Sequence, residues 1–397
     1  MRSEIAALIL FSILILDMGC SEQLEPQTSD EVADTSIENV IVLQDSIVNM
    51  GTFSYYSPTE WKSDSRLPVV LFFDPKGVGH EPIDKYKALA KELGLIIAAS
   101  NVSKNGLDMT AIRSHYKELS SELRKLFPKN GGQFILVGFS GGAKVAIQLG
   151  MTDPSVLGII ANGAMSDLTQ QRPNLPVALI SGKGDLNYSN MLMSSFQMIP
   201  SRPSTVFMQF DGGHEWSNRE ELTHSLVWIL SKAGFKFTNE RAELAGRMIE
   251  KVSDSRDLDE FVNTQALSIL YADLEGAESV RARLQEMAIS GDLSAWLDAF
   301  YQELDEEEAA KQDYIKRLDN SDLEWWKAEI SRLNLNTESD GETSFKSQRM
   351  LGFLGLYCYM KAKSEFKQNG AYPKDVVEVY LQLEPDNPEA QRMKESL

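Results

Sequence analysis

Residues 134–142 read Phe-Ile-Leu-Val-Gly-Phe-Ser-Gly-Gly, and this stretch decides the fold of the first half of the chain. Its first four residues form a short apolar run, which is typical of a strand buried on both faces of a sheet. Residues 138–142 then match the pattern G-x-S-x-G and lead into residues 143–151, whose apolar spacing predicts a helix. The glycines let the chain turn sharply enough to hold Ser140 in a strained conformation, and Gly142 permits close approach of the helix to the strand.

Short apolar runs alternate with helical patterns on both sides of this stretch. Strands are predicted at or within residues 40–56, 68–73, 95–99, 157–161, 176–180 and 205–210. Helices are predicted at residues 83–93, 109–126, 188–199 and 219–233. Such an alternation implies a mostly parallel sheet that is buried on both faces, so residues 39–236 are predicted to form a doubly wound α/β domain.

A serine hydroxyl is a weak nucleophile near neutral pH, so Ser140 needs a base, and the base needs a carboxylate that fixes its tautomer. His214 directly follows the last predicted strand and has two glycines before it, while Asp185 follows the strand before that one. Asp167 and Asp211 compete for the carboxylate role, but Asp211 is very close to His214 in sequence and Asp167 follows an earlier strand. We therefore predict Ser140 as nucleophile, His214 as general acid and base, and Asp185 as the orienting acid.

The chain order Ser140, Asp185, His214 is that of the α/β-hydrolase superfamily. Residues 40–236 resemble this superfamily, particularly compact esterases of the dienelactone-hydrolase and polyhydroxyalkanoate-depolymerase-like kind. The resemblance implies a serine esterase that hydrolyses a small-molecule or polymer-borne carboxylic ester through an acyl-enzyme. It implies neither a metal nor an organic cofactor.

The resemblance also implies an oxyanion hole made of two backbone N–H groups. Gly141 supplies one of them by the family pattern, because it directly follows the nucleophile. The second is expected from residues 74–77, which read Asp-Pro-Lys-Gly where family members often carry His-Gly-x-Gly. A proline has no N–H to donate, so Lys76 is assigned as the second donor, with Gly77 next.

Residues 237–397 carry no β pattern and are predicted to form a separate all-α domain of helical hairpins. Within them, residues 376–390 resemble the helix–turn junction of a tetratricopeptide repeat, which implies a surface for a protein partner. Two other functions therefore compete with the esterase. One is a binding scaffold whose hydrolase domain is degenerate, and the other is a serine peptidase that uses the same triad.

The N-terminus carries an apolar run of 12 residues, Ile5–Leu16, followed by Gly19-Cys20. A bilayer-spanning helix needs roughly 20 residues, so this run fits the hydrophobic region of a signal peptide instead. The Gly19-Cys20 step resembles a bacterial lipoprotein signal, which implies cleavage after residue 19 and a lipid on Cys20. Residues 20–38 are predicted to be a polar tether. The predicted location is the bacterial cell envelope, lipid-anchored at the outer membrane or in the periplasm, or else secreted.

The composition narrows the classes of partner. The 397 residues include 39 Lys and Arg against 58 Asp and Glu, a net charge of −19. This charge argues against nucleic-acid binding, and it leaves the lipid anchor as the only expected membrane contact. The two cysteines and four histidines show no zinc-ligand spacing. Two features stay open: residues 101–106 either line the substrate cleft or form a solvated turn, and Trp216 either walls the site or packs in the core.

Overall fold

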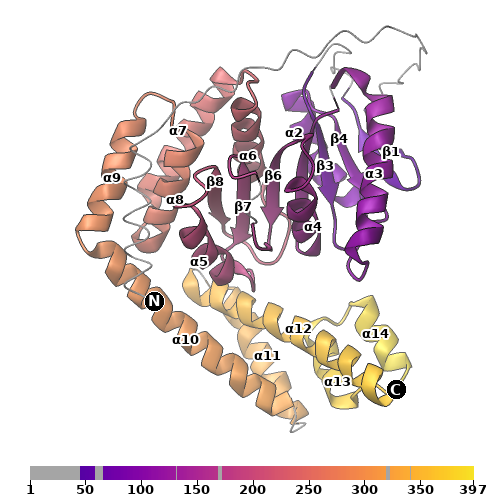
Figure 1. The fold of residues 1–397 in the computed structure, drawn as a ribbon. Helices are drawn as coiled ribbons and strands as arrows, with labels where there is room; N and C mark the ends of the chain where they lie inside the picture. Colours follow the sequence, from indigo (N-terminus) through magenta and orange to yellow (C-terminus); the bar gives the residue numbers. More distant parts are fainter. Residues whose placement is uncertain (1–44, 59–65, 131, 169–171, 319–321, 340) are drawn as a thin grey trace.

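The computed structural model describes residues 45–58, 66–130, 132–168, 172–318, 322–339 and 341–397. Their eight strands are β1 (Val48–Asn49), β2 (Phe53–Tyr56), β3 (Val69–Phe73), β4 (Ile97–Ser100), β5 (Phe134–Phe139), β6 (Val156–Asn162), β7 (Val177–Gly182) and β8 (Thr205–Phe210). They form one sheet in the order β1-β2-β4-β3-β5-β6-β7-β8 (Figure 1). β1 and β2 pair antiparallel, β2 is also antiparallel to β4, and the strands from β3 to β8 run parallel.

Each strand of the sheet's centre buries side chains on both faces. Leu71 and Phe73 of β3 join one core, together with α3 (Met109–Leu126), α4 (Gly141–Gly150) and α5 (Tyr188–Met198). Val70 and Phe72 join the other core, together with α2 (His80–Leu93) and α6 (Arg219–Lys232). All four side chains are fully buried, which explains why this strand is apolar without alternation. The predicted α/β class with a mostly parallel sheet is therefore confirmed.

The helix predicted at residues 109–126 shows how local sequence sets an element's ends. The carboxylate of Asp108 accepts hydrogen bonds from the backbone N–H groups of Thr110 and Ala111, at 2.8 and 3.0 Å. These bonds satisfy two of the donors that a helix leaves unpaired at its first turn. The helix α3 consequently begins at the predicted residue, and it ends at Leu126, also as predicted.

The helices of the second half are α7 (Thr238–Asp254), α8 (Asp257–Leu270), α9 (Ala277–Ile289), α10 (Asp292–Leu318), α11 (Leu323–Thr337), α12 (Glu342–Asn369), α13 (Lys374–Leu383) and α14 (Pro388–Glu395). The all-α character of this region is confirmed. Its predicted helix–turn junction is also present, because α13 ends at Leu383 and α14 begins at Pro388 with Asn387 as its cap. Membership of a repeat family stays a prediction.

The hydrophobic core does not divide at residue 237, where a separate domain was predicted to begin. Phe261 and Val262 of α8 pack in the same core as α3, α4 and α5, and Leu244 of α7 packs in the core shared with α2 and α6. A distinct third core appears only farther along, from Tyr314 of α10 onward. The first helices of the second half thus complete the α/β unit, because they cover apolar surface that β8 would otherwise expose.

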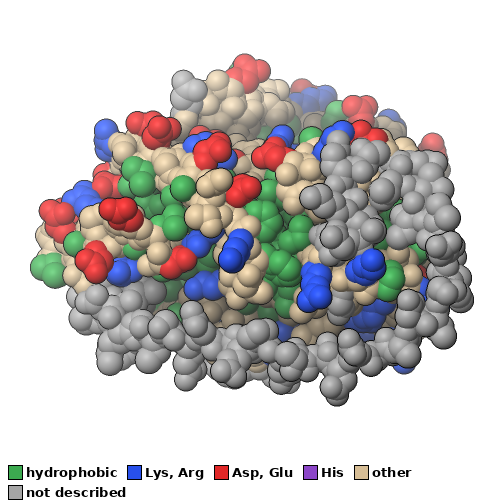
Figure 2. Space-filling model, turned by 90° about the horizontal axis from the view of Figure 1, so that it is seen from above, with side chains coloured by type: hydrophobic (Ala, Val, Ile, Leu, Met, Phe, Trp, Pro, Cys, Tyr) green, Lys and Arg blue, Asp and Glu red, His purple; other side chains and the backbone are tan. Residues whose placement is uncertain are grey.

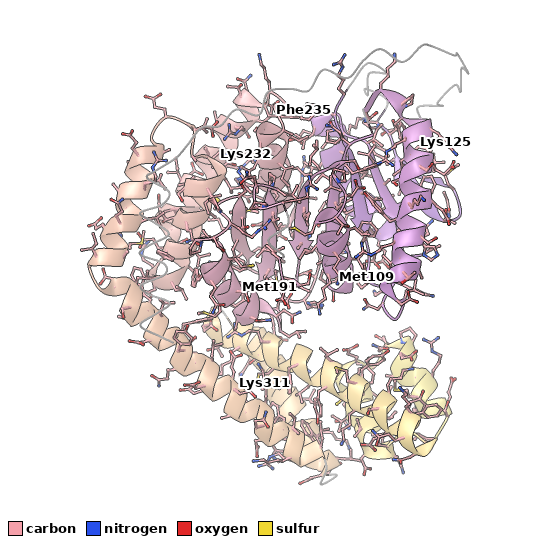
Figure 3. The ribbon with its side chains drawn as sticks, viewed as in Figure 1. Met109, Lys125, Met191, Lys232, Phe235 and Lys311 are labelled. Atoms are coloured by element: carbon pink, nitrogen blue, oxygen red, sulfur yellow. The ribbon has the colours of Figure 1, made fainter. Side chains whose placement is uncertain are left out.

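The carboxyl ends of the parallel strands lie at one edge of the sheet layer. Met109, at the start of α3, and Met191 of α5 lie at this edge, whereas Lys125 and Phe235 lie at the opposite one (Figure 3). Figure 2 looks onto that opposite edge, where acidic and basic side chains surround apolar ones and no histidine shows among the coloured atoms. Helices α11 to α14 lie beyond the carboxyl edge (Figure 1).

The predicted signal peptide, tether and lipidated Cys20 lie outside the described residues. Among the helices that the structure does describe, none is both long and apolar enough to cross a membrane.

Candidate active site

Ser140 sits in the turn between β5 and α4, at the carboxyl edge of the sheet. Its φ of 52° and ψ of −121° are strained for a residue with a side chain. The close approaches around it explain the two flanking glycines: a Cβ on Gly138 would lie 2.1 Å from the oxygen of Gly142, and a Cβ on Gly142 would lie 1.9 Å from the oxygen of Phe73. The predicted strand–turn–helix is therefore confirmed, together with the strain at the serine and the role of Gly142.

The structure brings Ser140, His214 and Asp185 together at the carboxyl ends of β5, β8 and β7. Nε2 of His214 lies 3.0 Å from Oγ of Ser140, and Nδ1 lies 2.9 Å from Oδ2 of Asp185. This geometry suits the tautomer in which Nδ1 donates to the carboxylate and Nε2 accepts from the serine hydroxyl. Asp185 is fully buried, while the His214 side chain is 29% exposed, so the imidazole is accessible from solvent.

Two residues that the sequence analysis did not single out hold this pair in place. A Cβ on Gly163 would lie 2.8 Å from Oδ2 of Asp185 and 3.3 Å from Nδ1 of His214, so only a glycine leaves room there. The backbone N–H of Asn187 donates to Oδ1 of Asp185 at 2.8 Å, and its side-chain amide donates to the oxygen of Gly163, also at 2.8 Å. The signal available in the sequence was the Asn-Gly step at the end of a predicted strand.

The competing carboxylates do not reach the base. Asp211 is 75% exposed and forms an ion pair with Lys183, at 2.8 Å. Lys183 also pairs with Asp259 of α8 at 2.9 Å. Burial lowers the pKa of Lys183, but the two carboxylates outweigh this effect and place its pKa above the usual range, so the side chain stays charged at neutral pH. Asp167 is exposed and has no hydrogen bond to His214.

Trp216 belongs to the core rather than to a wall of the site. Its side chain is 9% exposed and contacts the rings of Phe72 and Phe139, with centroids 5.8 and 5.4 Å away. Its indole N–H donates to Oδ2 of Asp74 at 3.3 Å. The Phe139 and His214 ring centroids are in turn 4.8 Å apart, so this aromatic group packs against the imidazole.

The predicted oxyanion donors behave differently from each other. Gly141 is the first residue of α4, and a helix leaves its first N–H groups without an intrahelical partner. The N–H of Lys76, by contrast, donates to Oδ1 of Asp74 at 2.8 Å, and the N–H of Gly77 donates to the oxygen of Asp74 at 3.1 Å. The assignment of Lys76 as second donor is therefore wrong in this structure, because the buried Asp74 folds the loop back onto itself.

The side-chain amide of Asn105 lies beside Gly141. Oδ1 of Asn105 lies 1.8 Å, and Nδ2 3.3 Å, from the position that a Cβ on Gly141 would take. The backbone N–H of Asn105 donates to the oxygen of Pro75 at 2.8 Å, which joins the loop at residues 101–106 to the loop at residues 74–77. Of the two roles that the sequence left open for residues 101–106, the contact favours a place at the candidate site over a purely solvated turn.

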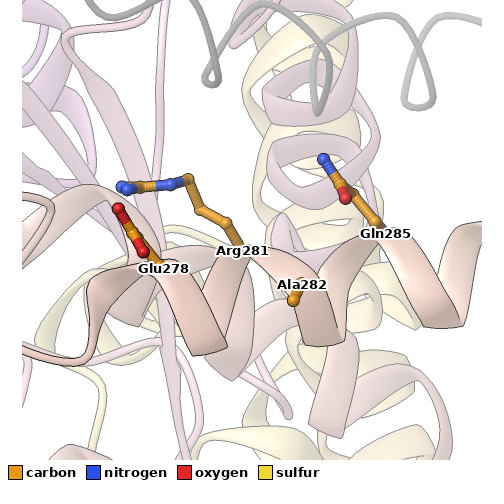
Figure 4. A pocket seen from close by; sticks show the side chains of 4 residues that line it. All are labelled: Glu278, Arg281, Ala282 and Gln285. Atoms are coloured by element: carbon orange, nitrogen blue, oxygen red, sulfur yellow. The ribbon is translucent and has the colours of Figure 1, made fainter.

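Figure 4 shows a pocket elsewhere on the molecule, lined by Glu278, Arg281, Ala282 and Gln285 of α9. These four residues share one helix, and none of them belongs to the triad. Within the described part of the chain, no group of three or more histidine, cysteine, aspartate and glutamate side chains could hold a metal ion.

No model of a known protein family matches the chain, and no curated protein matches it. Solved structures do match. S-formylglutathione hydrolase from Staphylococcus aureus is 13% identical with a TM-score of 0.36, over 45% of this chain and 92% of that one. A putative dienelactone hydrolase from Klebsiella pneumoniae is 12% identical with a TM-score of 0.33, over 46% and 92%. A poly(3-hydroxybutyrate) depolymerase from Bordetella parapertussis is 14% identical with a TM-score of 0.32, over 48% and 89%.

Proposed function

We propose that this chain is a serine hydrolase that cleaves carboxylic esters through Ser140, His214 and Asp185. The observation that supports this function is the unbroken row of hydrogen bonds from the serine hydroxyl, at 3.0 Å, through the imidazole to a buried carboxylate, at 2.9 Å. The serine at one end of the row has a strained backbone, and such strain clusters at active sites.

In the proposed reaction, Nε2 of His214 takes the proton of the Ser140 hydroxyl as Oγ attacks the ester carbonyl carbon. The tetrahedral intermediate collapses with cleavage of the bond to the alcohol oxygen, and His214 returns the proton to that oxygen. A water molecule then attacks the acyl-enzyme, giving one proton to His214, and the released serine oxygen takes this proton back. Asp185 stabilises the imidazolium that forms in each step.

The negative oxygen of each tetrahedral intermediate lies, in this proposal, between the backbone N–H of Gly141 and the side-chain amide of Asn105. Rotation of that amide about its last bond exchanges its oxygen and nitrogen, so it can turn its NH₂ group toward the oxyanion. Loss of a single oxyanion donor costs about 10²–10³-fold in kcat in well-studied hydrolases. The amide therefore supplies part of the catalysis that the loop at residues 74–77 was predicted to supply.

Labelling with a fluorophosphonate probe tests the proposed function. The wild-type protein is expected to react covalently, and Ser140→Ala is expected to lose both the label and roughly 10⁶-fold of the ester-hydrolysis rate. The matched control is Ser201→Ala, at an exposed serine outside the site, which should keep the label. A folded wild-type protein that takes no label would overturn the proposal and would favour the scaffold. Faster cleavage of amide substrates than of esters would favour the peptidase.

We also propose that the protein acts at the bacterial cell envelope as a lipid-anchored enzyme. The apolar run Ile5–Leu16 and the Gly19-Cys20 step support this location. Metabolic labelling with an alkyne-bearing fatty acid tests it: the wild type should carry the label and Cys20→Ala should not. Equal labelling of the two proteins, or none in either, would contradict the anchor.

A further inference from the structure

The loop that carries Asp185 is covered by α12, which belongs to the helical second half of the chain. A Cβ on Gly184 would lie 2.1 Å from Oε1 of Gln348, and a Cβ on Gly213, beside the catalytic histidine, would lie 3.4 Å from the same oxygen. Farther along α12, a Cβ on Gly352 would lie 3.3 Å from Cδ2 of Leu186. One helix therefore contacts the loop of the acid and the loop of the base, although it follows them by more than a hundred residues.

Arg349 of α12 makes the polar part of this contact. Its Nη1 donates to the backbone oxygen of Lys183, two residues before the acid, at 2.8 Å. Its Nε donates to Oε1 of Glu307 in α10 at 2.9 Å, and its Nη2 pairs with Glu307 and with Glu342. The side chains of Arg349 and Glu307 are each 2% exposed.

A buried ion pair of this kind is weak evidence for stability, because well-packed apolar residues often stabilise a protein as much. What apolar residues cannot replace is the hydrogen bond from Nη1 of Arg349, which fixes the carbonyl of Lys183 in the acid loop. The Lys183 side chain is also held from outside the loop, by Asp259 of α8 at 2.9 Å and over the ring of Phe345 of α12, 4.9 Å from its centroid. Helices α8 and α12 of the second half thus both contact the acid loop.

Backbone hydrogen bonds connect the acid loop to Asp185 and to the loop of the base. The N–H of Gly184 donates to the oxygen of Gly212 at 2.8 Å, which ties the acid loop to the loop of the base. The N–H of Asp185 donates to the oxygen of Gly182 at 3.0 Å, and the side chain then reaches His214. A shift of the Lys183 carbonyl therefore moves the carboxylate relative to the imidazole.

We propose that Arg349 is a positioning residue for the acid–base pair, so that the helical half of the chain sets the geometry of the triad. This proposal rests on the proposed function, because it concerns the same three residues. It predicts that loss of the bond to Lys183 lowers the turnover rate and leaves substrate binding nearly unchanged, since Arg349 itself lies beneath the loop and is buried.

The test uses the full-length chain and two variants, Arg349→Met with Glu307→Gln, and Arg349→Lys. The double change avoids a buried Glu307 whose only remaining ionic partner among the described residues is Lys311, 4.0 Å away, because breaking a buried ion pair would by itself destabilise the fold strongly. The control is Arg332→Met on α11, which breaks an ion pair with Glu329 at a side chain 55% exposed in the same helical region. Circular dichroism and thermal unfolding establish that each variant is folded.

Two readouts separate positioning from a merely structural role. The kcat of the double variant should fall about 10- to 100-fold, the size expected for a misplaced catalytic group, while KM stays within about twofold. The deshielded proton resonance of the His214–Asp185 hydrogen bond, assigned by its absence in Asp185→Asn, should shift or broaden. Arg349→Lys, which keeps the positive charge but places its donors on a single nitrogen, should recover part of both signals, and the control should change neither.

A folded double variant with unchanged kcat and an unchanged proton resonance would overturn the proposal. Failure of the proposed function would look different, because the wild type itself would then take no fluorophosphonate label. The proton resonance still decides the positioning role in that case, since it requires no catalysis.

Discussion

Gly163→Ala tests the acid–base pair through a residue that takes no part in the chemistry. Gly163 has a φ of +63°, where an L-residue costs about 1–2 kcal/mol of stability. The new Cβ would lie 2.8 Å from Oδ2 of Asp185, closer than real Cβ atoms approach a neighbour, so the carboxylate must move. Because a misplacement of about 1 Å in catalytic groups costs about 10²-fold, we expect kcat/KM to fall about 10- to 100-fold.

The matched control is Gly94→Ala, at the end of α2. Gly94 has a φ of +65°, and a Cβ there would meet nothing within 4 Å. Gly94→Ala should lose only the stability that the positive φ costs, whereas Gly163→Ala should lose more in thermal unfolding because its Cβ also lacks room. Only Gly163→Ala should lose activity toward a chromogenic ester. Equal activities in the two variants would show that the contact between the imidazole and the carboxylate does not limit the reaction, and the reasoning from the triad geometry would fail.

Individual contacts of Asn105, Gly142 and Cys358 can each be tested by substitution or labelling. Asn105→Ala and the isosteric Asn105→Asp, whose ionised side chain cannot donate a hydrogen bond, should each lower kcat about 10²-fold or more with little change in KM. Steady-state kinetics measures this, and full kcat in both variants would show that the amide is not an oxyanion donor. Gly142→Ala should destabilise the protein by at least about 1–3 kcal/mol, because its Cβ would meet a β3 carbonyl at 1.9 Å. Gly246→Ala, which has open space around it in α7, should stabilise the protein by up to about 1 kcal/mol. Urea titration measures the free energy of unfolding of both variants. Burial raises the pKa of Cys358 to about 12, so in a Cys20→Ser background a thiol reagent at pH 8 should react only after unfolding, and fast reaction of the native protein would contradict this.

The α/β half of the fold was predictable because its signals are local. The run at residues 69–73 is apolar at every position because β3 is covered on both faces. The glycines around Ser140 indicate the turn that follows β5. The triad was predictable for a related reason: parallel strands place the loops after their carboxyl ends at one edge, so residues far apart in sequence meet there. What the sequence could not show was the second oxyanion donor, because Lys76 is engaged by Asp74, a contact that depends on how one loop folds back.

The place where the core of the first half ends could not be predicted from sequence patterns, for a physical reason. The change from strands to helices at residue 237 is real, but secondary structure does not say which surface a helix covers. Phe261 of α8 reads in the sequence as one apolar residue among many in a helix, and only its burial in the sheet's core shows that it belongs to the first half. A domain boundary is set by where apolar contacts cease, and those contacts are long-range.

Long-range contacts also connect the helical half to the candidate site. In a chain whose second half formed its own core from residue 237 onward, a charged residue such as Arg349 would be expected at the surface, where its charge is solvated. It is buried instead, against a carboxylate of α10 and the backbone oxygen of Lys183, so the contact between the halves includes a directed hydrogen bond as well as apolar packing. Apolar packing alone tolerates small sliding, whereas a guanidinium fork fixes its acceptors in direction and distance. Asp185, the proposed orienting acid, lies two residues beyond one of those acceptors, so the helical half is a structural component of the candidate active site.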